Sequence, residues 1–273
     1  MPETAPTDHR VTVRQAVAAW SDWYVRMGVL DAIGNEGDGR TQQVAPAGPT
    51  ASAPVSRIEP RPERRAPARD GERVQHARAI ASACHSLADL AAALERFDGC
   101  PLQQTATRLC FAEGSPQAKL MLIGEAPGAE EDRQGKPFVG PSGQLLDRML
   151  AAIGLDRRSV WITNIVFWRP PGNRAPTTTE IAVCQPFVER QIELLRPRHI
   201  LFLGGSAARG LLEVTEGVTK LRGRPFVYKP ADVAPIPAGI TFHPAYLLRQ
   251  PLQKRLAWRD LLTLRRQLSE AAA

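Results

Sequence analysis

Three short motifs carry side chains that could do chemistry, and each follows an apolar run that predicts a strand. The first spans residues 124–140 and reads GEAPGAEEDRQGKPFVG. The second is Thr163-Asn164, with WRPPGNR at 168–174, and the third is HPAYLLR at 243–249. Ligands of open α/β sheets bind where the carboxyl ends of parallel strands meet. We therefore expect the three motifs to line one pocket.

The elements that must position these motifs follow from hydrophobic periodicity and turn residues. Strands are predicted at 119–123, 160–166, 199–203 and 240–243, with 224–228 as a candidate extra edge strand. Helices are predicted over 143–153, 178–195, 207–212 and 252–270. Strands that alternate with helices predict an α/β fold, a three-layer α/β/α arrangement around a central four-stranded, mainly parallel sheet.

The chain of 273 residues divides by composition into three parts. Residues 1–34 predict an amphipathic helix, because apolar side chains recur from Val13 to Met27 at steps of four and three. This helix either docks on the main core or binds another protein. Residues 35–73 are rich in Pro, Ala and Arg, which predicts a disordered linker. Residues 74–273 are expected to form the folded, functional domain.

The overall composition favours some partners without identifying one. Lys and Arg number 35 against 28 Asp and Glu, which gives a net charge of +7. A basic surplus favours nucleic acid as a partner, although arginines from a GC-rich genome give the same surplus. No apolar run is long enough for a membrane span, and the N-terminus lacks a secretory pattern. A cytoplasmic location is expected.

Taken together, the motifs resemble family 4 of the uracil-DNA glycosylase superfamily. The resemblance covers about residues 97–264, and its pieces are GEAPG, EDRQGKPFVGPSGQLL, TNIV, RPPGNRAPT and FHPAYLLR, in the family's order. It implies a monofunctional hydrolase that flips uracil out of single- or double-stranded DNA and cleaves its N-glycosidic bond. It also implies a role at the start of base excision repair. The enzyme is expected to be a monomer.

The resemblance assigns roles to the residues of the pocket. Glu125 is the candidate water-positioning group, and His243 donates to uracil O2, where charge develops as the bond breaks. Asn164 can donate to O4 and accept from N3–H, because an amide has both groups. Phe138 offers its ring to the base. Taken singly, Phe138 and His243 also fit plain core residues. The substrate-binding set is Gly124, Ala126, Phe138 and Asn164.

DNA contacts are expected around the first and third motifs. Backbone amides near Ser142 and Gly143, at a helix start, could grip a phosphate. Leu247 or Leu248 could fill the gap left by the flipped base, and Arg249 could hold a phosphate.

The resemblance also implies a [4Fe–4S] cluster held by four cysteines. Cys100 and Cys184 match two of the four ligand positions, and the other two hold Phe97 and Trp168. These aromatic side chains could fill the volume of a cluster by packing. We therefore expect a chain without a cofactor.

Two other functions stay open on the residues alone. The acidic run Glu130, Glu131 and Asp132 is of a kind that is usually solvated. It could instead bind a metal for hydrolysis of nucleotides or phosphoesters. The chain could also be an inactive DNA-binding relative, although the joint presence of the four assigned pocket side chains argues against loss of activity.

Overall fold

The computed structural model describes residues 67–270. The helix predicted within 1–34 and most of the predicted linker lie outside the described residues. The first described helix, α2 (Pro67–Ser82), begins before Val74, so it includes the end of the segment that composition assigns to the linker. Within 67–270, no helix is both long and apolar enough to cross a membrane.

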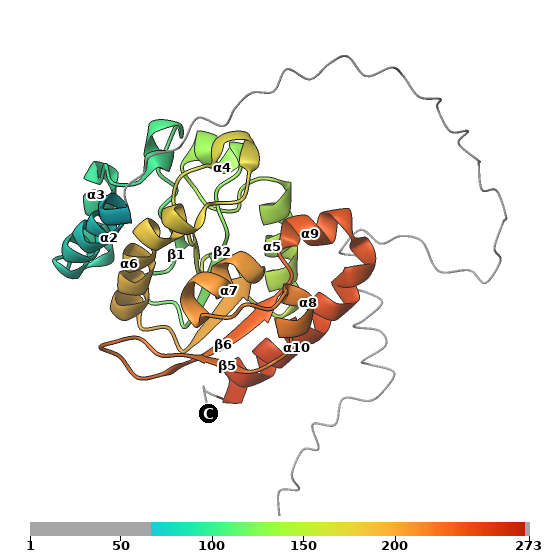
Figure 1. Ribbon diagram of the computed structural model, residues 1–273. Helices are drawn as coiled ribbons and strands as arrows, with labels where there is room; N and C mark the ends of the chain where they lie inside the picture. The colour runs from blue at the N-terminus through green and yellow to red at the C-terminus, as the bar shows by residue number, and fades with distance from the viewer. Residues whose placement is uncertain (1–66, 271–273) are drawn as a thin grey trace, which may run out of the picture.

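A six-stranded sheet forms the centre of the fold, in the order β1-β3-β2-β4-β6-β5 (Figure 1). The four inner strands are parallel to one another. They are β2 (Leu120–Gly124), β3 (Trp161–Asn164), β4 (His199–Leu203) and β6 (Ile236–Thr241). The α/β fold with a mainly parallel sheet is confirmed.

The sheet has two strands more than the predicted four, because a short antiparallel strand extends it at each edge. They are β1 (Glu113–Gly114), which pairs with β3, and β5 (Phe226–Tyr228), which pairs with β6. The one at 226–228 confirms the candidate edge strand predicted at 224–228. Strand β1 has two residues and no apolar run, so hydrophobic periodicity could not reveal it.

Helices cover both faces of the sheet (Figure 1). On each face an apolar core fills the space between the sheet and its helices. One core joins the sheet to α2, α3 (Leu87–Arg96), α6 (Thr178–Leu195) and α7 (Gly205–Leu212). The other joins it to α5 (Pro141–Ala152), α9 (Pro244–Arg249) and α10 (Lys254–Glu270). The connections contain two short helices, α4 (Ala129–Gln134) and α8 (Val218–Leu221). They also contain three 3₁₀ turns, η1 (Pro101–Gln104), η2 (Pro171–Asn173) and η3 (Pro251–Gln253).

Strand β2 shows how the sequence builds both cores. Its side chains point alternately to opposite faces of the sheet. Met121 and Ile123 belong to the core under α6, whereas Leu120 and Leu122 belong to the core under α5. The continuous apolar run is therefore that of a strand buried on both faces, as expected of a parallel sheet between helices.

Helix starts follow the sequence signals. The Ser86 side chain caps α3 by accepting from the Asp89 N–H at 3.0 Å. Thr177 and Glu180 form a capping box at the start of α6, with the Glu180 carboxylate accepting from the Thr177 N–H at 2.7 Å. Helix α6 thus begins at Thr178, as predicted.

Candidate active site

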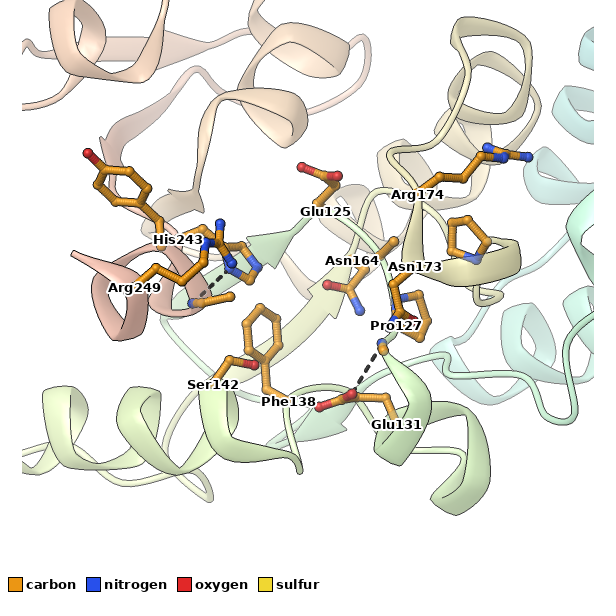
Figure 2. A pocket seen from close by; sticks show the side chains of 15 residues that line it. Glu125, Pro127, Glu131, Phe138, Ser142, Asn164, Asn173, Arg174, His243 and Arg249 are labelled. Atoms are coloured by element: carbon orange, nitrogen blue, oxygen red, sulfur yellow. Dashed lines mark hydrogen bonds between the residues drawn. The ribbon is translucent and has the colours of Figure 1, made fainter. Parts of the chain in front are cut away.

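The three motifs meet at a cavity of about 410 Å³ at the carboxyl ends of the inner strands (Figure 2). Its volume suits a small organic ligand. The lining residues are Glu125, Ala126, Pro127, Gly128, Glu131, Phe138, Ser142, Asn164, Pro170, Asn173, Arg174, His243, Ala245, Tyr246 and Arg249. The structure therefore brings most of the predicted pocket residues together.

Asn164 ends strand β3 and points into the cavity (Figure 2). Its side chain is only 1% exposed, yet among the described residues neither Oδ1 nor Nδ2 has a hydrogen-bond partner. Buried amide groups without partners are rare, because each costs about 1–3 kcal/mol. An amide in this state is suited to pair with a ligand that offers one donor and one acceptor side by side.

Gly124 lies directly beneath this amide, opposite Asn164 in the ladder between β2 and β3. A Cβ atom at Gly124 would lie 2.4 Å from Asn164 Oδ1 and 2.5 Å from Phe138 Cζ. The amide and the ring thus converge over bare backbone. This close approach explains why glycine ends the strand.

His243 caps α9, and its environment sets both its tautomer and its charge. Its Nδ1 accepts a hydrogen bond from the Ala245 N–H at 3.1 Å, so the proton of the neutral ring lies on Nε2. Burial lowers the pKa of the imidazole to about 4, with nearby Glu125 opposing the shift and Arg249 adding to it. Near neutral pH the residue is therefore an uncharged Nε2–H donor.

Phe138 forms a wall of the cavity next to His243 (Figure 2). The side chain is 4% exposed, and its ring centroid lies 5.5 Å from that of His243, at 31° between the planes. Its backbone is left-handed, with φ of +55°. Such a conformation is uncommon for a bulky residue and requires support from neighbouring groups.

Glu125 and Ala126 line the cavity where β2 gives way to the loop. Their position is fixed through backbone contacts: the Ile165 N–H donates to the Gly124 carbonyl at 2.9 Å, and the Val166 N–H to the Glu125 carbonyl at 3.3 Å. The Glu125 carboxylate lies at the cavity, apart from the Asn164 amide (Figure 2).

The acidic run after this loop does not behave as predicted. Glu130 alone is paired at the surface, with Arg133. Glu131 and Asp132 are buried and accept hydrogen bonds from backbone N–H groups, so the expectation of a solvated run is wrong for both. Among residues 67–270, no three His, Cys, Asp or Glu side chains are grouped as metal ligands, so the metal-dependent alternative gains no support.

The predicted DNA-contacting residues divide into exposed and buried ones. Ser142 lines the cavity in the first turn of α5, but Gly143 is buried against the Phe138 carbonyl, where a Cβ would lie 1.7 Å from the oxygen. Leu247 is 1% exposed and belongs to the core, whereas Leu248 is 40% exposed. Of the two candidates for a wedge, only Leu248 is available. Arg249 borders the cavity.

The cysteines do not form the four-thiolate set of an iron–sulfur cluster. Cys100 and Cys184 are fully buried, and the Cys184 thiol donates to Cys100 Sγ at 3.8 Å, so the two sulfurs touch with no cluster core between them. Phe97 and Trp168 are 2% and 3% exposed. Phe97 packs on Phe187 at 5.0 Å between centroids. A [4Fe–4S] cluster requires four thiolates, so these residues do not fit one.

Several lining residues carried no assigned role in the sequence analysis. Asn173 has φ of +56°, and its Oδ1 accepts from Arg169 Nε at 2.7 Å. Arg174 pairs with Glu180 through two hydrogen bonds, at 2.6 and 2.8 Å. The RPPGNR motif contains both residues, but the sequence alone did not indicate what each of them does. Glu131 had no readable signal, because Gly128, three residues earlier, has no side chain to complete a capping box.

Comparisons with known proteins agree with the geometry. Residues 111–262 match the family model described as the uracil DNA glycosylase superfamily. The chain is 39% identical to a type-4 uracil-DNA glycosylase of Sulfurisphaera tokodaii, covering 61% of this chain and 77% of that protein. It is 38% identical to the type-4 enzyme of Pyrobaculum aerophilum, over 62% of this chain and 87% of that protein. For the type-4 enzyme of Thermotoga maritima the identity is 40%, over 57% and 80%.

Proposed function

The chain belongs to the uracil-DNA glycosylase superfamily, and on that premise we propose that its cavity holds one uracil flipped out of DNA. As a uracil-DNA glycosylase it hydrolyses the N-glycosidic bond of uracil in DNA, which begins base excision repair. The bond between uracil N1 and deoxyribose C1′ breaks. The base leaves with the bonding electrons, water adds to C1′, and the proton lost by that water balances the charge of the departing base.

One observation carries this proposal: the Asn164 amide has no hydrogen-bond partner within the described part of the chain. Uracil presents O4 as an acceptor beside the N3–H donor, so Nδ2 can donate to O4 while Oδ1 accepts from N3–H. Cytosine presents a donor and an acceptor in the opposite order, so both atoms of this amide would face like groups in the orientation that pairs with uracil. Asn164 thus supports binding of the base, and it selects uracil if the bound orientation is kept.

His243 supplies the stabilisation of the leaving group in this proposal. As the glycosidic bond breaks, negative charge grows on uracil O2, and a fixed donor aimed at that atom lowers the barrier. The neutral Nε2–H of His243 is preorganised for this because the Ala245 N–H holds Nδ1. A donor of this kind typically contributes about 100- to 1,000-fold in rate.

Phe138 and the first loop complete the proposed pocket. The Phe138 ring gives the base a face to stack on, beside His243. Glu125 and the backbone of Gly124 and Ala126 are proposed to position the attacking water near C1′. The Glu125 carboxylate at the cavity supports this role.

The rim of the cavity supports contacts with the rest of the DNA. Leu248 is exposed at the end of α9 and is proposed to fill the space of the flipped base. Arg249 and the N-terminal turn of α5 at Ser142 are proposed to contact phosphates, which fix register without reading sequence. We also propose that the enzyme acts as a monomer.

The proposed enzyme works without an iron–sulfur cluster. Aromatic packing by Phe97 and Trp168 takes the place of two ligands, and the sulfurs of Cys100 and Cys184 lie 3.8 Å apart in direct contact. Iron and sulfide analysis of protein purified without oxygen should find neither. About four irons per chain with thiolate ligation would contradict this part of the proposal.

The function is tested by release of the free base. Single- and double-stranded oligonucleotides with one uracil, and matched ones with cytosine or thymine, are incubated with the protein in EDTA. Free uracil and an alkali-labile site at the uracil position are expected, with no release of cytosine or thymine. Absence of uracil release from both substrates would refute the function, and loss of release in EDTA would favour metal-dependent chemistry.

A further inference from the structure

Phe138 needs external support, because its left-handed backbone is not a conformation that a phenylalanine adopts by itself. The ring must nevertheless stay fixed if it is to hold a base. The hydrogen bonds around residues 137–140 show where that support comes from.

The carboxylate of Glu131 is the first support, since it joins the two loops that form this side of the cavity. Its Oε1 accepts from the Val139 and Gly140 N–H groups, both at 2.9 Å, directly after Phe138. Its Oε2 accepts from the Gly128 N–H at 3.1 Å, in the loop that follows β2 (Figure 2). One buried side chain therefore fixes the loop of Glu125 relative to the loop of Phe138.

Capping of α4 explains only part of this arrangement. A capping box needs the contact of Oε2 with the Gly128 N–H, at the start of the helix. The two contacts of Oε1 lie outside α4 and serve a segment that has no other regular structure. Glu131 is 7% exposed, so these charge-assisted bonds form away from water, where they are strong.

Arg157 supports the same segment from its carbonyl side. Its guanidinium donates to the Phe138 carbonyl and, at 3.1 Å, to the Pro137 carbonyl. Glu113 at 2.8 Å and Asp147 at 3.0 Å hold the guanidinium in turn. The backbone around Phe138 is thus held by two side chains. The Glu131 carboxylate accepts from N–H groups after Phe138, and the Arg157 guanidinium donates to the carbonyls of Pro137 and Phe138.

We propose that Glu131 is a positioning residue for uracil excision, with Arg157 as its counterpart, and that the pair holds the Phe138 ring in its stacking position. The inference rests on the proposed function of the cavity. Neither residue touches the reacting bond, so each acts through Phe138. Small displacements of a stacking group weaken the reaction more than they weaken the fold, because catalysis depends on near-attack geometry.

A double-mutant cycle tests the proposal through the chemical step. Single-turnover uracil release is measured for wild type, Glu131→Gln, Phe138→Ala and the double variant. Glutamine keeps the shape but turns one acceptor oxygen into a donor that faces an N–H group. Glu131→Gln should slow uracil release by about 10- to 100-fold when Phe138 is present. When Phe138 is already replaced by alanine, Glu131→Gln should have little further effect, so the double variant should be little slower than Phe138→Ala. The Kd for uracil-free DNA should stay unchanged.

Matched variants separate positioning from general damage. Glu130→Gln changes the exposed neighbouring acid and should leave the rate unchanged, whereas Arg157→Lys should slow release and couple to Phe138→Ala in the same way. If the effects of Glu131→Gln and Phe138→Ala multiply, or if Glu131→Gln has the wild-type rate, the positioning role is refuted. If wild type releases no uracil, the proposed function itself fails.

Discussion

The Phe138 ring lies 5.5 Å from the His243 imidazole, centroid to centroid, with 31° between their planes. The two residues are far apart in the sequence, one in the segment between α4 and α5 and the other in the turn between β6 and α9. Their proximity means that a base stacked on Phe138 presents its edge to the donor on His243. Several properties of this pocket can be tested on the protein without DNA.

Replacement of Asn164 by leucine should make the protein more stable and inactive. Leucine has a similar volume and removes two buried polar atoms that no group within residues 67–270 satisfies, so unfolding should cost about 1 kcal/mol more. Uracil release should fall below detection. Thermal unfolding and single-turnover release measure the two effects on the same preparation.

Gln191→Leu is the matched control for this prediction. Gln191 is also a buried amide, and its Nε2 likewise has no partner within residues 67–270, but its Oε1 accepts from Trp161 Nε1 at 2.9 Å. Its replacement leaves the indole without a partner and should lower stability. If Asn164→Leu destabilises the protein as much as Gln191→Leu does, the Asn164 amide has partners in the free protein and the inference from its burial is wrong.

Gly124→Ala should obstruct the base-binding pocket, because the added methyl group projects between Asn164 and Phe138. The new Cβ would crowd Asn164 Oδ1 and Phe138 Cζ at 2.4 and 2.5 Å, so both side chains must move. We expect about a 100-fold fall in the rate of uracil release with little loss of stability. Gly217→Ala, whose new methyl group would meet only Thr219 Oγ1 at 4.0 Å, an ordinary contact, should have the wild-type rate. A fully active Gly124→Ala variant would contradict the pocket as described.

His243 should remain neutral well below its ordinary pKa. Burial favours the uncharged ring and lowers its pKa to about 4, so the Nε2–H tautomer should persist between about pH 5.5 and pH 7.5. Nitrogen NMR of protein labelled on histidine can observe this directly, with His243→Gln identifying the signal. Because the unfolded state takes up this proton near pH 6.5 and the folded state only near pH 4, stability should fall on acidification through that window. A His243 signal that titrates near pH 6.5 would contradict the assignment.

Leu247 and Leu248 should differ although they are neighbours. Leu248→Ala should slow excision from double-stranded DNA and leave single-stranded DNA almost unaffected, because a wedge matters only where a base leaves a stack. Leu247→Ala should instead reduce the free energy of unfolding by about 2–5 kcal/mol, since the side chain is buried in the core. The opposite pattern would show that α9 rotates on DNA and presents Leu247.

Hydrophobic periodicity predicted where the strands lie but not where they end. The apolar run at 160–166 suggested one strand, yet β3 ends at Asn164. Ile165 and Val166 remain fully buried, and their N–H groups donate to the carbonyls of Gly124, the last residue of β2, and of Glu125. An apolar run reports burial, whereas pairing depends on the partner strand, which stops at Gly124.

The sequence identified the residues that face a ligand better than the residues that hold them. Phe138, Asn164 and His243 stood in recognisable motifs. Glu131 looked like part of a solvated acidic run, because its three partners are backbone N–H groups that leave no trace in residue types. Arg157 lies outside every motif and meets Phe138 only through the fold. Support of this kind becomes visible only when the backbone is in place.

The most direct test of the account is the rate of uracil release by wild type and by His243→Gln under single-turnover conditions. Both are assayed on one single-stranded oligonucleotide with a single uracil. We predict one uracil released per site by wild type, and a rate about 100- to 1,000-fold lower for His243→Gln, with unchanged DNA affinity. Equal rates for the two proteins would contradict the central claim that the neutral Nε2–H of His243 stabilises the departing base.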